Sequence, residues 1–102
     1  METIINNQTF QWDDEKAALN RQKHGITFET AALVFADENR IERYDSAHSD
    51  NEERYITIGR VKEVLFVVYT ERRDTTRIIS ARKATPKERG LYYGGIGNFY
   101  FA

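Results

Sequence analysis

Apolar residues near the start of the chain recur at the spacing of amphipathic helices. Asp13 suits a helix N-cap, the segment after it runs toward His24, and Gly25 provides a C-terminal stop. A second helix follows another cap residue, Thr27. Its apolar stripe consists of Phe28, Ala31, Ala32 and Phe35. We expect the two helices to form a hairpin.

After residue 39 the pattern changes to that of β-strands. Residues 40–44 are short and charged, as edge strands often are. Residues 54–60 alternate between apolar and polar positions, and residues 64–70 are apolar on both faces, which is typical of a central strand. A turn at 72–75 leads to a last strand at 77–81. We therefore expect an antiparallel sheet of three to four strands.

The last helix carries the clearest start signal in the chain. Thr85 is a cap residue, Pro86 follows at the first helical position, and Glu88 stands three residues after the cap, which together form a capping box. The helix runs to Tyr93, and residues 94–102 form a tail rich in glycine and aromatic residues. The whole order predicts an α+β fold, with an N-terminal helical hairpin packed on a small antiparallel sheet and then a C-terminal helix.

Length and composition fit one folded domain. At 102 residues the chain is too short to build two cores, so we expect a single domain over residues 1–102. Cysteine is absent, which removes disulfides and thiolate chemistry. The N-terminal segment does not resemble a leader, and no apolar run approaches the roughly 18 residues of a membrane span. We expect a cytoplasmic protein that does not associate with membranes.

The net charge of −1 conceals a division along the chain. Residues 1–53 contain 12 acidic and 5 basic residues, a net charge of −7, whereas residues 54–102 contain 4 acidic and 10 basic residues, a net charge of +6. Such asymmetry suggests an anionic partner for the basic half, and nucleic acid is one candidate. The two halves can equally attract each other across the fold.

Several kinds of chemistry lack the residues that they need. The two histidines, His24 and His48, are not spaced with other good ligands as in a metal-binding helix, and His48 stands in a polar loop that suits solvated charge. The sequence GGIG lies near the C-terminus with no helix after it, so it cannot form a phosphate-binding loop. No nucleophile elbow is present. We expect neither a metal nor a cofactor.

Arginine and tyrosine are concentrated in the second half of the chain. Planar guanidinium groups bind phosphate through two oxygens at once, and aromatic rings stack on unpaired bases, so this combination favours RNA. Each arginine taken alone is better explained by a solvated surface or an ion pair, and only the set as a whole suggests RNA. The set consists of Arg54, Arg60, Lys62, Arg72, Arg73, Arg77, Arg82, Lys83, Lys87 and Arg89, with Tyr55, Tyr69, Tyr92 and Tyr93.

Strand geometry limits how these arginines can cooperate. Arg77 and Arg82 are five positions apart, so in a regular strand they point to opposite faces of the sheet. They converge only if the strand ends or bulges before Arg82. Because Thr85 requires a turn soon afterwards, we expect the strand to end near Ala81, which would place Arg82 and Lys83 in one basic corner with the start of the last helix.

Five motifs in a fixed order resemble those of the BrnT ribonuclease toxins of bacterial type II toxin–antitoxin systems. The motifs are FxWD, KHGITFExA, ERYITIG, LFVVYTER and RIISARKATxKERxxY. They extend from Phe10 to about Tyr93, and RIISARKA with the following ER is the most specific of them. The resemblance implies a RelE-like fold and an endoribonuclease that arrests growth. It also implies a cognate BrnA-like antitoxin with a ribbon-helix-helix DNA-binding region, whose complex with the toxin represses its own promoter.

The residues suggest a mechanism in which the RNA 2′-OH attacks the adjacent phosphate without a metal ion. Arg77 and Arg82 are the first candidates for phosphate binding, followed by Arg54 and Arg72. The candidates for proton transfer are Tyr69, Glu88, His24 and Tyr92, although the capping box alone explains Glu88, and a helix C-terminus alone explains His24. Further candidates for RNA binding are Lys23, Arg60, Lys83, Lys87, Arg89 and Tyr92.

Two other functions remain open. A non-catalytic module could hold RNA or a protein on the same basic, aromatic surface, and a purely structural subunit would use these charges only in assembly. In the tail, Phe99, Tyr100 and Phe101 are candidates for contact with the antitoxin.

Overall fold

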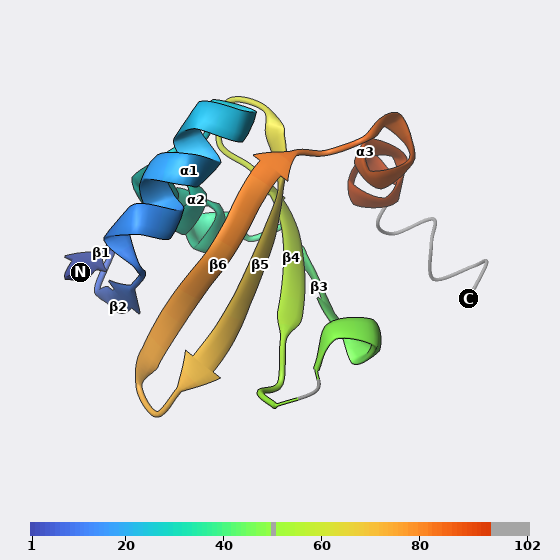
Figure 1. The fold of residues 1–102 in the computed structure, drawn as a ribbon. Helices are drawn as coiled ribbons and strands as arrows, with labels where there is room; N and C mark the ends of the chain where they lie inside the picture. Colours follow the sequence, from blue (N-terminus) through green and yellow to red (C-terminus); the bar gives the residue numbers. More distant parts are fainter. Residues whose placement is uncertain (50, 95–102) are drawn as a thin grey trace.

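The computed structural model describes residues 1–49 and 51–94. Within these residues it contains three α-helices, two short 3₁₀ helices and six strands (Figure 1). None of these helices has the length and apolar character that crossing a bilayer requires. The elements are β1 (Glu2–Ile5), β2 (Gln8–Gln11), α1 (Asp14–His24), α2 (Phe28–Leu33), η1 (Val34–Ala36), β3 (Ile41–Tyr44), η2 (Ser46–His48), β4 (Tyr55–Arg60), β5 (Val64–Arg72), β6 (Thr75–Lys83) and α3 (Pro86–Tyr93).

The strands form one mixed sheet in the order β1-β2-β6-β5-β4-β3. Neighbouring strands are antiparallel except β2 and β6, which run parallel. The α+β class is confirmed, as is the position of β3 at an edge. The expected size and type of sheet are wrong, because the described part of the chain has six strands rather than three to four and one pair is parallel. The helical pair is also not N-terminal, since β1 and β2 precede it.

The missed hairpin at the N-terminus has a recognisable cause. Asn6 and Asn7 connect β1 and β2 with φ angles of 52° and 66°, which is the left-handed conformation of both central residues in a type I′ turn. Asparagine tolerates this conformation better than most residues. A two-residue Asn-Asn connection between short alternating segments was therefore an available hairpin signal.

The first two helices begin at the cap residues expected from the sequence. The Asp13 side chain accepts a hydrogen bond from the backbone N–H of Lys16, at 3.0 Å, and Gly25 ends α1 with a φ of 72°. The Thr27 side chain caps α2 in the same way. α2 is shorter than the apolar stripe predicted, because the chain tightens into the 3₁₀ helix η1 after Leu33.

The sheet has two differently covered faces. α1 and α2 cover the first face, where the larger core includes Phe10, Trp12, Phe28, Val67 and Ile78. Burying each such large side chain contributes about 1.5–3 kcal/mol to stability. α3 lies on the other side of the sheet (Figure 1), and a smaller core joins it to the second face. The smaller core consists of Ile58, Val64 and Ala84, with Ile41, Ile56, Phe66 and Tyr92 partly buried around it.

Asn20 fixes α1 to β6. Its buried side chain donates hydrogen bonds to the backbone oxygens of Ile26 and Ala81, each at 2.9 Å, and accepts one from the backbone N–H of Ala81 at 3.1 Å. Removing a buried amide that satisfies three backbone groups would leave them without partners. The C-terminal part of α1 is therefore held beside the last residues of β6.

Candidate nucleic-acid interface

β6 continues past the point where the sequence suggested that it ends. It runs to Lys83 and contains one irregularity, because Tyr69 pairs with Ile78 and Val68 pairs with Ser80. Ile79 thus has no partner in β5, as at a β-bulge. The expected strand end near Ala81 is wrong, because the pairing with β5 persists beyond it.

The bulge places Arg77 and Arg82 on the same face of the sheet. Ile78 and Ala81 are both buried in the core of the first face, so the alternation of side chains turns the neighbouring Arg77 and Arg82 to the second face. Their partners on β5 are Thr70 and Phe66, four residues apart. At a rise of about 3.3 Å per residue, the two arginines are about 13 Å apart along the sheet. They suit two phosphates of one strand rather than a single phosphate.

Arg82 is held firmly by α3 and by the sheet beneath it. Its Nη1 and Nη2 donate to the two carboxylate oxygens of Glu88 at 2.7 and 3.0 Å, and its guanidinium carbon lies 4.0 Å from the centre of the Phe66 ring. Glu88 also accepts the backbone N–H of Thr85 at 2.8 Å, which completes the capping box. The bonds from Arg82 lower the pKa of Glu88, so this carboxylate is a weak base. Glu88 therefore orients Arg82 and caps α3.

A second group of arginines lies at the opposite end of the second face. We call Arg54, Arg72 and Arg77 the arginine cluster. Arg72 donates through Nε to Glu52 at 2.9 Å, and Arg77 donates through Nη1 to Gln11 at 2.9 Å. The hydrogen bond from Arg72 lowers the pKa of Glu52, and the positive charges of Arg77 and Arg54 lower it further. The carboxylate of Glu52 thus interacts with the positive charge of all three guanidinium groups of the arginine cluster.

The segment before β4 brings further polar groups to this cluster. Thr70, on the second face, donates to the backbone oxygen of Glu53 at 2.7 Å, so this segment crosses that face. In Figure 1, η2 and α3 both lie on the side of the sheet away from α1 and α2. A cavity of about 240 Å³ lies here and is lined by His48, Asn51, Glu52 and Arg54.

The sequence did not predict the positions of three residues in this region: His48, Glu52 and Gln11. His48 and Glu52 were assigned to a solvated loop, and Gln11 belongs to the hairpin that was missed. His48 Nδ1 lies 3.1 Å from the carboxylate of Asp45, three residues before it. That spacing in a loop, followed by Glu52, was the only signal available, and it is also common in solvated loops.

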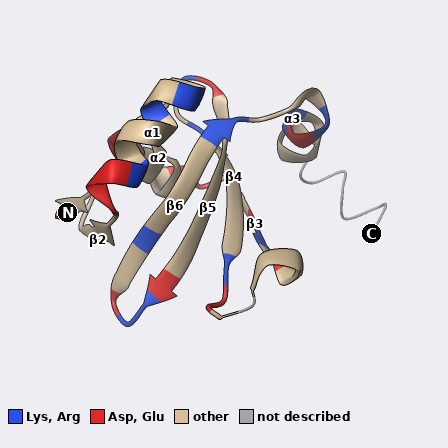
Figure 2. Cartoon of the chain, in the orientation of Figure 1, with Lys and Arg blue, Asp and Glu red and all other residues tan. Residues whose placement is uncertain are grey.

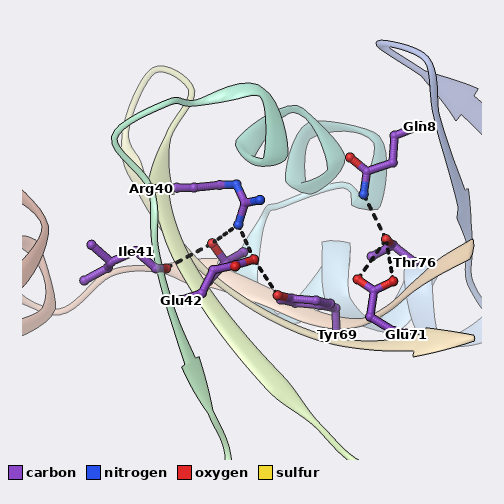
Figure 3. Close-up of polar contacts among 8 residues, drawn as sticks. Gln8, Arg40, Ile41, Glu42, Tyr69, Glu71 and Thr76 are labelled. Atoms are coloured by element: carbon purple, nitrogen blue, oxygen red, sulfur yellow. Dashed lines mark hydrogen bonds and ion pairs between the residues drawn. The ribbon is translucent and has the colours of Figure 1, made fainter. Parts of the chain in front are cut away.

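Tyr69 does not belong to this interface. Its ring lies on the first face against Phe35, and its hydroxyl donates to Glu42 at 2.6 Å (Figure 3). Burial and the bond to Glu42 raise the pKa of Tyr69, which makes the hydroxyl harder to deprotonate. Glu42 also pairs with Arg40, so Tyr69 is part of a polar network between β3, β4 and β5. The structure separates it from the arginines of the second face.

Further positive charge gathers at the end of the molecule where β6 leads into α3. Figure 2 shows Lys and Arg on the C-terminal part of α1, the end of β6 and α3 at this end of the molecule. Lys23 and His24 are the last residues of α1, which packs on the first face. They therefore lie near the end of β6 but not over the second face.

The remaining candidates for RNA binding surround α3. Lys83 pairs with Glu63 at 3.5 Å, and Arg89 donates to the backbone oxygen of Ala84 at 3.1 Å. Tyr92 is partly buried, and its hydroxyl donates a hydrogen bond to Asp37 at 2.6 Å. Proton transfer by Tyr92 would use this hydroxyl, which is already engaged. The two others, Arg60 and Lys87, are exposed at the end of β4 and in the first turn of α3.

The proposed antitoxin contacts in the tail cannot be compared with the structure. Phe99, Tyr100 and Phe101 lie outside the described residues. They stay a prediction from the sequence.

The arrangement of helices and sheet is shared with a known toxin. The crystal structure of the Brucella abortus ribonuclease toxin BrnT matches with a TM-score of 0.58 and 22% sequence identity, over 74% of this chain and 95% of that chain. Comparison with curated proteins returned no match. The family model described as "Ribonuclease toxin, BrnT, of type II toxin-antitoxin system" matches residues 12–88, which is more than half of the chain. The protein therefore belongs to the BrnT family of ribonuclease toxins of type II toxin–antitoxin systems.

Proposed function

We propose that this protein is an endoribonuclease that inhibits growth by cleaving RNA in the cytoplasm and that a cognate antitoxin neutralises it. The observation that carries the proposal is the presence of Arg77 and Arg82 on one face of the sheet, together with Arg54 and Arg72. Membership of the BrnT family supports a toxin that acts on RNA. The RNA strand would lie across the second face, between α3 and the segment that contains η2.

The RNA itself supplies the nucleophile, so the reaction needs no nucleophilic side chain. The 2′-OH attacks the adjacent phosphorus, and negative charge builds on the phosphate oxygens in the transition state. Arg77 is partly exposed, and within residues 1–49 and 51–94 its side chain bonds to the neutral side chain of Gln11, so it is available to stabilise that charge. Arg82 already shares its guanidinium with Glu88, so its role is to hold a neighbouring phosphate and to position the strand. Losing one transition-state donor typically lowers the rate by about 10²- to 10³-fold.

The proposal extends to the partner and the superfamily. We infer a BrnA-like antitoxin with a ribbon-helix-helix region, through which the toxin–antitoxin complex would bind promoter DNA. The covered first face and the open second face also agree with a RelE-like fold in a single domain. These inferences rest on the family and on the motifs quoted above.

Induced expression of the chain without its antitoxin tests the enzymatic function. We expect the wild type to stop growth and to fragment cellular RNA, and Arg77→Ala to relieve both. Arg21→Ala removes an exposed arginine from α1, on the other side of the sheet, and should stay as toxic as the wild type. Arg77→Ala protein should keep a wild-type far-ultraviolet spectrum and stay folded at the growth temperature.

The same experiment separates an enzyme from a binding module. A chain that binds RNA tightly but leaves it intact in every condition would contradict the nuclease function. With purified protein, a fully 2′-deoxy oligonucleotide should be bound but not cut, because it lacks the nucleophile. Cleavage of that oligonucleotide at the rate of its RNA counterpart would exclude attack by the 2′-OH.

A further inference from the structure

The proposed reaction needs a group that accepts the proton of the 2′-OH, and the candidates named from the sequence do not suit it. Tyr69 lies on the first face, Tyr92 donates to Asp37, and Glu88 is bonded to Arg82 through both oxygens. His24 ends a helix that covers the first face. A base that acts on RNA at the arginine cluster must come from the second face.

His48 meets the geometric requirements for such a base. Its side chain is 69% exposed, so RNA can reach it, whereas the Asp45 side chain that it contacts is only 13% exposed and is held in place. The Asp45 carboxylate lies 3.1 Å from Nδ1. This contact favours a proton on Nδ1 and leaves Nε2 with a free lone pair, which is the tautomer that a base requires.

The surroundings of His48 connect it to the phosphate-binding groups. His48 shares a cavity of about 240 Å³ with Asn51, Glu52 and Arg54. Glu52 is in turn bonded to Arg72 at 2.9 Å and lies within the field of Arg77. Among the described residues, the charged groups around His48 are Asp45 beside the ring and Glu52 and Arg54 in the cavity, while Arg72 and Arg77 from β5 and β6 act on Glu52. A phosphate at Arg54 and Arg77 would place its ribose near this cavity.

We propose that His48, oriented by Asp45, is the general base of RNA cleavage in this protein. The proposal rests on the proposed ribonuclease function and names the proton acceptor for it. His48 Nε2 takes the proton of the 2′-OH while the O2′–P bond forms, and the P–O5′ bond then breaks. The leaving 5′ oxygen takes a proton from water. The products are a 2′,3′-cyclic phosphate and a free 5′-hydroxyl, and His48 returns its proton to solvent.

Glu52 is the competing base in the same cavity, and its environment argues against it. Both of its oxygens lie within hydrogen-bonding distance of Arg72, at 2.9 and 3.4 Å. A carboxylate held by a guanidinium group is a weak base. Glu52 therefore positions the arginine cluster, and His48 carries the proton.

The experiment measures cleavage of a fluorescent RNA oligonucleotide by the full-length chain and compares the two histidines. His48→Gln should lower kcat by about 10²-fold or more, as loss of a general base usually does, with KM close to the wild-type value. His24→Gln is the matched control and should keep the wild-type kcat. Both variants should bind the uncleavable 2′-deoxy oligonucleotide as the wild type does, which shows that they are folded.

The pH profile distinguishes a base from a structural side chain. An imidazole must be neutral to accept a proton, so wild-type kcat/KM should rise with increasing pH. His48→Gln should lack this rise. Asp45→Asn removes the carboxylate that favours the proton on Nδ1, so it should lower kcat without abolishing RNA binding.

The possible failures are distinguishable. If the wild type cuts RNA and His48→Gln cuts it equally fast, or if the rise with pH persists in His48→Gln, the assignment of His48 is wrong while the nuclease function stands. A loss of kcat in His24→Gln alone would transfer the role to His24. A wild type that binds RNA and never cuts it would remove both proposals.

Discussion

Arg77 and Arg82 face the same side of the sheet but differ in how the protein holds them. Arg82 makes two hydrogen bonds to Glu88 and stacks on Phe66, and its side chain is 34% exposed. Arg77 makes one hydrogen bond, to Gln11. At the scale of single residues, we therefore expect the first arginine to contribute to stability as well as to the proposed RNA binding, and the second mainly to the proposed RNA binding.

Substitution of each arginine by alanine should separate the two contributions. Arg82→Ala leaves Glu88 without its partner and exposes Phe66, so we expect a loss of about 1–3 kcal/mol in the free energy of unfolding. Arg77→Ala should lose about 1 kcal/mol or less. Urea denaturation monitored by the fluorescence of Trp12 measures both. Equal losses would show that the contacts of Arg82 have no net effect on stability.

The role of a single residue could be predicted from the sequence only where its partners lie close to it in the chain. The capping box is an example: the spacing of Thr85, Pro86 and Glu88 predicts it, and the structure contains it. The bond between Glu88 and Arg82 joins a helix to a strand, which spacing does not indicate. His48 was less predictable still, because only the folded chain shows that it shares a cavity with Arg54 and with Glu52, which binds Arg72.

At the scale of secondary structure, α3 is attached to the sheet largely through polar contacts. Arg82 binds Glu88, Tyr92 binds Asp37, and Arg89 binds the backbone of Ala84. None of the residues of α3 is fully buried. Ion pairs and hydrogen bonds thus largely determine where α3 lies on the second face. The position of α3 is therefore sensitive to pH.

Acidification should weaken the attachment of α3. The bonds from Arg82 lower the pKa of Glu88, so this contact contributes fully to stability above about pH 4.3, where free glutamate titrates, and is lost as the pH falls through the lowered pKa. Glu88→Gln removes the titrating group. The difference in free energy of unfolding between the wild type and Glu88→Gln should therefore shrink as the pH falls from about 6 to about 3. A constant difference would contradict this account.

Local sequence patterns predicted most of the helices and strands, but they did not predict which strands pair in the sheet. Caps and apolar spacing predicted α1, α2 and α3, alternation predicted β4, and a run that is apolar on both faces predicted β5. The bulge at Ile79 escaped prediction because no residue type requires it, yet it decides which way Arg82 points. The parallel pairing of β2 with β6 depends on contacts between distant parts of the chain, which no local pattern specifies.

At the scale of the whole molecule, the divided charge acts partly within the fold, and the anionic partner of the basic half stays a prediction. Glu52 and Asp37 belong to the acidic half and bind Arg72 and Tyr92 of the basic half, so the halves do attract each other. Arg77 nevertheless makes no ion pair within the described residues. A nearly neutral protein can thus still present positive charge to an anionic partner on one face of its sheet.

The tail should contribute to antitoxin binding and not to catalysis. Deleting residues 95–102 keeps Gly94, which caps α3, so the described fold should be unaffected. We expect the shortened chain to cut RNA like the wild type and to bind its antitoxin more weakly, because Phe99, Tyr100 and Phe101 are removed. Coexpression with the antitoxin and measurement of Kd by calorimetry checks this. An unchanged Kd would exclude these three residues from the contact.

The place of β6 in the sheet has a consequence for synthesis on the ribosome. Among the described residues β6 is the last strand, yet it lies between β2 and β5, and its Arg77 meets Gln11 across 66 residues. Contacts between such distant segments form late, because the intervening chain must first exist. A nascent chain that ends before residue 75 has neither the central strand nor Arg77 and Arg82. It therefore lacks the arginines that the proposed function requires, so we expect the ability to cut RNA to arise only as translation nears completion.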